Sequence, residues 1–135
     1  MINASFWEVQ KAIFTHLSQN PNLKDMIADR LYDTFGPNTH FPYVIIGLGR
    51  YQPWSSKTFK GADHHFPIHI WSSYKGQKEV KEIAELIERA LTTNFPNLAH
   101  QHIVGLHIEQ FHVQVDQENQ LMHGVLKIRI RSHGL

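Results

Sequence analysis

Residues 41–47, Phe-Pro-Tyr-Val-Ile-Ile-Gly, are the most informative stretch of the sequence, and they predict a buried central strand. Residues 43–49 are rich in β-formers and place apolar side chains on both faces of the expected strand. A strand with that pattern is usually interior and covered on each side. The Phe-Gly-Pro-Asn sequence of residues 35–38 predicts the turn that leads into it.

Two helical segments are expected before this strand. The first begins near Ser5, which has the Ser-x-x-Glu capping spacing with Glu8. Its apolar face consists of residues at helical spacing: Phe6, Val9, Ile13 and Leu17. Pro21 cannot continue that helix, and a short second helix is expected over residues 23–31.

Residues 52–63 are polar and contain proline and glycine, so they are expected to form an exposed loop. A strand over residues 64–72 follows, with Phe66, Ile68 and Ile70 on one face and His65, His69 and Trp71 on the other. Pro67 lacks a backbone donor, which predicts a free side or a bulge at that point of the strand.

The remaining chain predicts a helix and a long hairpin. Residues 76–94 combine an apolar stripe with a charged surface, which is typical of an amphipathic helix. In residues 104–115 the alternation of apolar side chains changes parity, and this predicts a β-bulge near Glu109 and Gln110. A turn is expected at residues 116–119. The last strand is expected to bury Met122, Leu126, Ile128 and Ile130.

Together these segments predict an α+β fold in the order α-β-β-α-β-β. We expect an antiparallel sheet, mixed at most, of about four strands packed against two main helices. The 135 residues fit one domain spanning residues 1–135.

Composition excludes several classes of function. The chain has no cysteine, which removes disulfides, thiolate metal sites and cysteine nucleophiles. Its apolar runs are far shorter than the ~20 residues of a membrane helix, so no membrane partner is expected. The net charge of +1 gives no indication of a polyanionic partner.

Sequence patterns of catalysis are absent as well. There is no phosphate-binding loop, complete dinucleotide fingerprint or nucleophile elbow, so neither an enzyme nor a cofactor is expected. The eleven histidines leave open a metal-dependent enzyme. His65 and His69 share a face but stand ~13 Å apart on a strand, too far for one ion. We therefore interpret the histidines as surface or rim residues.

A basic row is the other candidate for chemistry. Strand alternation places Lys127, Arg129 and Arg131 on one face, a spacing that could follow phosphate groups. Because no aromatic residue interleaves with the row, base stacking is unsupported. A solvent-facing or subunit-contacting strand is favoured over a small nucleic-acid-binding α+β module, which stays open as the alternative function.

The ordered set of segments resembles the tail-terminator, or tail-completion, family of long-tailed phages, prophages and gene transfer particles. The resemblance runs from Leu31-Tyr32-Asp33 and Pro37 through residues 41–47 to Ile68-His69-Ile70-Trp71-Ser72, then through Gly76 into the helix over residues 79–91 and the final hairpin. It covers roughly residues 7–131.

This resemblance implies a structural protein that caps the finished tail tube as a ring, commonly a hexamer, and stops polymerisation. Its implied partners are other copies of itself, the major tail tube protein and the head-completion or connector protein, with DNA passing through the channel without sequence-specific binding. Its implied location is the head-proximal end of the virion tail, after assembly in the host cytoplasm.

The loop over residues 52–63 is the expected place for contacts with partners. Trp54 and Phe59 are apolar anchors in a polar stretch, and Lys57 and Lys60 lie beside them. The alternative for both aromatic residues is packing back onto their own subunit.

Overall fold

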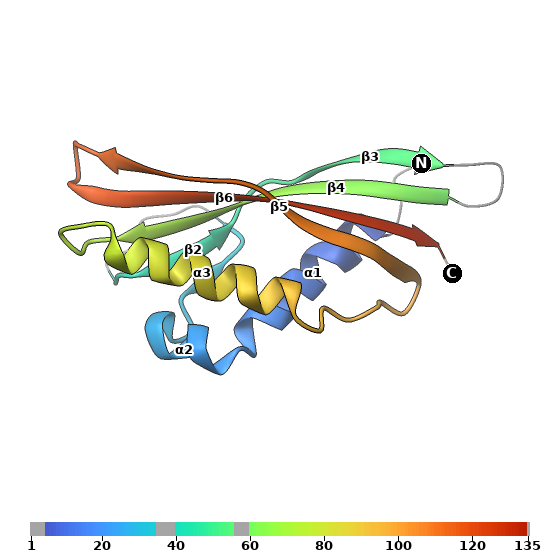
Figure 1. The fold of residues 1–135 in the computed structure, drawn as a ribbon, viewed down its shortest axis with the longest axis horizontal. Coiled ribbons are helices and arrows are strands. Elements are labelled where there is room, and N and C mark those ends of the chain that lie inside the picture. Colours follow the sequence, from blue (N-terminus) through green and yellow to red (C-terminus); the bar gives the residue numbers. More distant parts are fainter. Residues whose placement is uncertain (1–4, 35–39, 56–59, 135) are drawn as a thin grey trace.

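The computed structural model describes residues 5–34, 40–55 and 60–134. All three helices lie on one side of a single long, twisted sheet (Figure 1). In chain order the elements are α1 (Ser5–Ser18), α2 (Pro21–Ile27), β1 (Leu31–Tyr32), β2 (Tyr43–Ile46), β3 (Arg50–Ser55), β4 (Lys60–Ser72), α3 (Lys78–Thr92), β5 (Gln101–Asp116) and β6 (Leu121–Gly134). The predicted α+β class is confirmed.

The sheet contains six strands, in the order β1-β2-β4-β6-β5, with β3 also paired to β4. Its pairings are antiparallel apart from the parallel contact of β1 with β2, so the sheet is mixed. The prediction of about four strands missed β1 and β3. β1 is only two residues long, which is too short to show an alternation of apolar side chains.

β3 and the start of β4 correct the predicted loop over residues 52–63. Gln52 is registered against Asp63, and the pairing continues to Ser55 against Lys60. Backbone hydrogen bonding to the long strand β4 outweighs the polar side chains of this segment. Pro53 is tolerated because β3 is an edge strand, whose outer side needs no donor. Residues 56–59 lie outside the described part of the chain.

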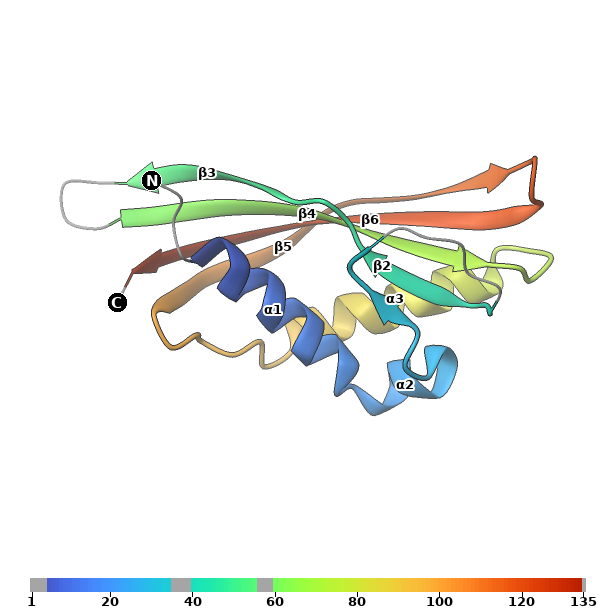
Figure 2. The ribbon, with the colours of Figure 1, turned by 180° about the vertical axis from the view of Figure 1, so that it is seen from behind.

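The predicted free side at Pro67 is confirmed. On that side of β4 the pairing with β3 ends at His65 and the pairing with β2 begins at Ile68. Pro67 therefore lies where the chain passes from β2 to β3, visible as the bend between these strands (Figure 2). Its carbonyl accepts a hydrogen bond of 2.7 Å from the Gly47 amide.

The helices begin and end close to the predicted residues, with one correction. The second helix was expected over residues 23–31, whereas α2 spans Pro21–Ile27. The Asn20 side chain caps it by accepting a hydrogen bond of 2.9 Å from the Leu23 amide. Pro21 therefore starts α2 as well as ending α1, since proline is well tolerated in a first helical turn. None of the helices in the described residues is long and apolar enough to cross a membrane.

The core lies between the helices and the alternate residues of the long strands. β4 contributes Phe66, Ile68 and Ile70, each at most 1% exposed, and β6 contributes its own alternate apolar residues. The helical residues packed against them are Val9, Ile13, Leu17, Val80, Ile83, Ala84, Ile87 and Leu91. The predicted apolar faces of α1, β4, α3 and β6 are therefore confirmed.

The long hairpin of β5 and β6 contains the predicted bulge. The register shifts between Ile108 and Gln110, which returns Phe111 to the helix-facing side. A second shift between Ile103 and Gly105 was not predicted.

β2 is buried on both faces as predicted, although it ends at Ile46 instead of continuing to Gly49. Tyr43 and Ile45 point away from the helices and are covered by neighbouring side chains. The Tyr43 ring stacks against Trp71 with 6.4 Å between centroids.

Candidate functional site

The face of the sheet opposite the helices is the candidate functional surface, and we call it the outer face. No helix of the described residues lies over it (Figures 1 and 2). Alternation along β4 and β6 decides which side chains it carries: Asp63, His65, Pro67, His69 and Trp71 from β4, and His123, Val125, Lys127, Arg129 and Arg131 from β6.

Asp63 is the centre of a charge network on this face. Its carboxylate accepts hydrogen bonds from Arg129, of 2.8 Å from Nε and 2.6 Å from Nη2. Arg131 Nε and His65 Nε2 lie 3.8 Å and 3.4 Å from the same carboxylate. Although Asp63 is only 7% exposed, the hydrogen bonds from Arg129 hold its pKa below its usual range. The carboxylate is therefore a permanent, buried anion at neutral pH.

This network alters the interpretation of the basic row. Lys127, Arg129 and Arg131 do share one face, as predicted, but Asp63 lies within ion-pair distance of both arginines. Lys127 is exposed, and no carboxylate of the described residues lies within ion-pair distance of its amine. Two of the three charges are thus engaged within the subunit, which leaves little of the row for phosphate groups.

Trp54 packs back onto its own subunit. Its Nε1 donates a hydrogen bond of 2.9 Å to the Ala62 carbonyl, and the Arg131 guanidinium lies 5.2 Å from the ring centroid. Sequence reasoning missed this aromatic contact with the basic row because β3 was predicted as a loop. Any role of Trp54 in binding a partner stays a prediction.

The structure describes one of the other three predicted contact residues of this segment. Lys60 is exposed at the start of β4, and Lys57 and Phe59 lie outside the described residues.

The other end of the outer face carries a histidine pair that sequence reasoning did not predict. His69 Nδ1 and His123 Nε2 lie 2.8 Å apart, and Trp71 stacks on His123 with 3.8 Å between ring centroids. Burial lowers the pKa of both imidazoles, to about 4 for His123. Both are therefore neutral at pH 7, when one ring can donate its proton to the other.

The interpretation of every histidine as a surface or rim residue is wrong for His64. This residue is fully buried on the helix-facing side, and burial lowers its pKa to about 4. Its Nε2 lies 3.2 Å from the Ser132 hydroxyl. His64 shares the parity of Phe66 and Ile68 along the strand, so the signal for burial was present in the sequence.

No group of three or more histidine or acidic side chains is placed to hold a metal ion in residues 5–34, 40–55 and 60–134. The described side chains thus offer charge pairs and hydrogen bonds rather than a ligand set.

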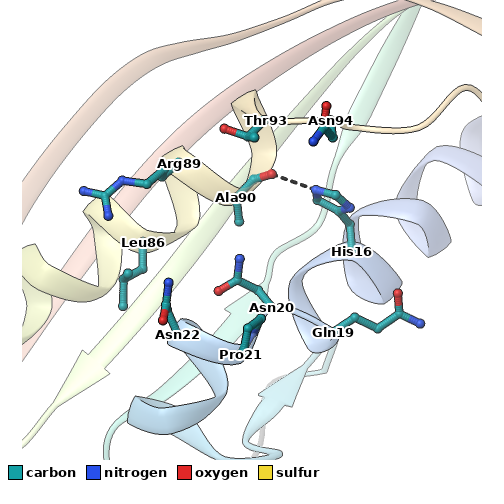
Figure 3. Close-up of a pocket in the computed structure, with 10 residues that line it drawn as sticks. All are labelled: His16, Gln19, Asn20, Pro21, Asn22, Leu86, Arg89, Ala90, Thr93 and Asn94. Atoms are coloured by element: carbon teal, nitrogen blue, oxygen red, sulfur yellow. Dashed lines mark hydrogen bonds between the residues drawn. The ribbon is translucent and has the colours of Figure 1, made fainter.

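A hollow of about 460 Å³ lies on the helical side, where the end of α1, the start of α2 and the end of α3 meet (Figure 3). The His16 Nε2 lies 2.7 Å from the Ala90 carbonyl oxygen, and the imidazole must donate because a carbonyl can only accept. Its lining contains amides, one guanidinium and no carboxylate. This arrangement ties α1 to α3 and lacks a nucleophile–base pair within the lining.

Comparisons with known proteins agree with the geometry. The profile of the family described as tail completion protein gp17 matches residues 11–133. The chain belongs to this tail completion family. It is therefore a structural protein of a virion tail, and the family is not one of enzymes.

Two relatives illustrate the match. Tail completion protein gp17 of Bacillus phage SPP1 is 24% identical over 121 residues, covering 90% of this chain and 89% of the relative. A chain in the solved virion of a native gene transfer agent particle has the same fold, with a TM-score of 0.84 at 24% identity. That alignment covers 93% of this chain and 95% of the other.

Proposed function

We propose that this protein is a tail terminator: its copies close into a hexameric ring on the head-proximal end of the tail tube and stop further polymerisation. The observation that carries the proposal is the family match, which extends over residues 11–133 and so includes nearly every element of the fold. A relative of almost the same length is named a tail completion protein.

The shape of the sheet supports a ring. β5 forms one margin and pairs only with β6 among the described strands, whereas β3 and β1 form the other margin. The two margins differ in length and sequence, so contacts between neighbouring copies would join unlike surfaces. Heterologous contacts of that kind close into rings when the rotation between copies closes.

The remaining partners follow from the same proposal. One side of the ring meets the major tail tube protein, and the other meets the head-completion or connector protein. The stretch of sequence that contains Trp54, Lys57, Phe59 and Lys60 is a candidate contact for either. DNA passes through the axial channel without sequence-specific binding, consistent with the internal pairing of Arg129 and Arg131 by Asp63. Assembly takes place in the host cytoplasm.

The test is a polymerisation assay with purified tail tube protein. Tubes grown with this protein should stop at a limited length and carry a ring at one end in negative-stain images. Tubes grown with the same amount of heat-unfolded protein should continue to elongate. Unlimited growth, with bare tube ends at saturating concentrations of folded protein, would overturn the proposal.

A further inference from the structure

Leu48 is the most exposed of the large apolar residues that the structure describes, at 84%. It lies between β2 and β3, with glycine on each side. A Cβ atom at Gly47 would lie 2.9 Å from the Pro67 ring, and one at Gly49 would lie 2.4 Å from the Phe66 ring. The backbone therefore runs tightly against β4 at both glycines, and the side chain between them projects outward.

No contact among residues 5–34, 40–55 and 60–134 buries a leucine at this projecting position. A polar residue would satisfy the same backbone, because only the two glycines are in close contact with β4. An apolar side chain held in water loses the free energy that burial would supply. Exposure of a single leucine is common by itself, and the surroundings of Leu48 are what make it a candidate for contact with a partner.

Two cations that have no carboxylate partner in the described part of the chain lie around Leu48. A hollow of about 250 Å³ beside it is lined by Arg50, Lys127, His65 and Glu109, among others. Glu109 is held by His65 at 3.0 Å, whereas no carboxylate of the described residues lies within ion-pair distance of Arg50 or Lys127. We call Leu48, Arg50 and Lys127 the knob. Its chemistry fits an apolar hollow bordered by carboxylates.

The subunit has such a hollow at the turn of the β5–β6 hairpin. A space of about 820 Å³ separates that turn from the segment between β4 and α3. Its apolar lining residues are Tyr74, Val115, Leu121 and Met122, and Lys75 is the one cation of the lining. Tyr74 and Val115 are 51% and 55% exposed, so the hollow is incompletely filled within the subunit.

Two carboxylates of the same turn are sequence neighbours of lining residues, although neither lines the hollow itself. Asp116 and Glu118 flank Gln117, which is one of the lining residues. Hydrogen bonds from Asn119 lower the pKa of Asp116, so its carboxylate is charged at neutral pH. We call Tyr74, Val115, Leu121 and Met122, with the two carboxylates, the socket.

Knob and socket lie at different places along the sheet. Leu48 and Arg50 follow β2 and Lys127 lies within β6, whereas the socket lies at the turn between β5 and β6 (Figures 1 and 2). Lys127 and the socket residue Met122 are separated along β6 by ~17 Å of extended strand. A contact between them cannot form within one subunit, and between two copies it joins unlike surfaces. It is therefore heterologous, as a closed ring requires.

We propose that Leu48 of one copy inserts into the socket of the next copy, with Arg50 and Lys127 facing Asp116 and Glu118. This inference rests on the proposed function and deepens it, because it names the surfaces that join neighbouring subunits in the ring. The occupant of the socket is a second copy of this chain, since the knob supplies both the apolar side chain and the opposite charge.

Cross-linking tests the contact directly, because the natural chain has no cysteine. Leu48→Cys and Val115→Cys are made as separate variants, assembled together on tail tubes and oxidised. Disulfide-linked dimers should form in the mixture and not in either variant alone. The control mixture is Leu48→Cys with Val104→Cys, which replaces a valine of β5 of similar exposure, 50% against 55% for Val115, far from the socket.

A charge exchange tests the electrostatic part. Lys127→Glu and Glu118→Lys should each lower the yield of rings on tubes, and the chain with both changes should recover most of it. Glu85→Lys, on the exposed side of α3, is the matched control and should leave the yield unchanged. Leu48→Asp should reduce the yield roughly tenfold or more, because it places a charge in an apolar contact.

The outcomes separate this inference from the proposed function. If the natural chain caps tubes but the cysteine pair does not cross-link, the knob-and-socket contact is wrong and the terminator proposal stands. If Leu48→Cys cross-links to a cysteine variant of the tube protein instead, the assignment of a second copy is overturned. If the natural chain neither forms rings nor caps tubes, the proposed function fails.

Discussion

The two faces of the sheet are held by different kinds of interaction. On β4, Phe66, Ile68 and Ile70 enter a core that is closed by three helices, while His65, His69 and Trp71 face away from the helices. The covered face is held by apolar burial, which depends on size and shape. The outer face is held by directional contacts such as the Asp63–Arg129 pair. The comparison suggests that stability resides mainly in the first face and specificity in the second.

The largest effect on stability is expected from the covered face. Ile68→Ala removes a side chain that is fully buried and should cost about 2–5 kcal/mol of unfolding free energy, through lost burial and a residual cavity. Urea denaturation followed by circular dichroism measures it. Lys127→Ala on the neighbouring strand is the control and should stay within about 0.5 kcal/mol. Equal losses of unfolding free energy in the two variants would contradict the inference that stability resides mainly in the covered face.

A smaller loss is expected when the charge network of the outer face is broken. Arg129→Met leaves the buried Asp63 carboxylate without its two shortest hydrogen bonds, so the unfolding midpoint in urea should fall. The additional change Asp63→Asn removes the unpaired charge and should recover part of the stability. If Arg129→Met alone is as stable as the natural chain, the charge network does not stabilise the fold and only orients its side chains.

Mild acid should weaken the fold through histidines on both faces. His64 and His123 have pKa values of about 4 in the folded chain, against about 6.5 when unfolded. Between these values the unfolded chain binds more protons, so unfolding free energy falls as the pH drops from about 6.5 towards 4. His123→Gln should reduce this slope, as measured by urea denaturation at a series of pH values. Gln117→Ala, at an exposed position without a titratable group, is the control and should leave the slope unchanged.

The smallest effect concerns nucleic acid. Lys127→Gln removes the one cation of the basic row that is not paired with Asp63, while the buried network stays intact. A tail terminator should bind DNA weakly, and the salt dependence of its binding should change by roughly one charge at most. Fluorescence anisotropy with duplex DNA at several salt concentrations measures this. Tight binding that Lys127→Gln abolishes would restore the nucleic-acid-binding alternative.

The predicted elements differ from the observed ones where pairing with a neighbouring strand, and not the local sequence pattern, decides the structure. The apolar periodicity of α3 and the alternation of β4 were sufficient to predict each element and its buried face, because each pattern shows directly which side chains are buried. The bulge between Ile108 and Gln110 was also predictable, since the parity of the apolar residues changes there. β3 was not predictable in this way: Gln52 and Pro53 have no strand pattern, and only the backbone of β4 makes them a strand.

The candidate site was less predictable than the fold. Asp63 and Arg129 are 66 residues apart in the chain, and nothing near either residue indicates their pairing. The pairing of His69 with His123 depends in the same way on the register between β4 and β6. The role of Trp54 in binding a partner stays a prediction, and its contacts with Ala62 and Arg131 depended on the pairing of β3 with β4, which the sequence did not indicate.

By itself the sequence determined the α+β class, the presence of a buried strand within residues 41–47, and which alternate side chains of the long strands face the core. It could do so because burial follows local periodicity. The middle of this stretch, Tyr43–Ile46, is the buried strand β2, and the place of residues 41–47 in the ordered set of segments pointed to the family. Only the tertiary structure decided which charges are paired and that Leu48 projects from the sheet. Those properties depend on strand register and on close backbone contacts between distant segments, for which a local pattern carries no signal.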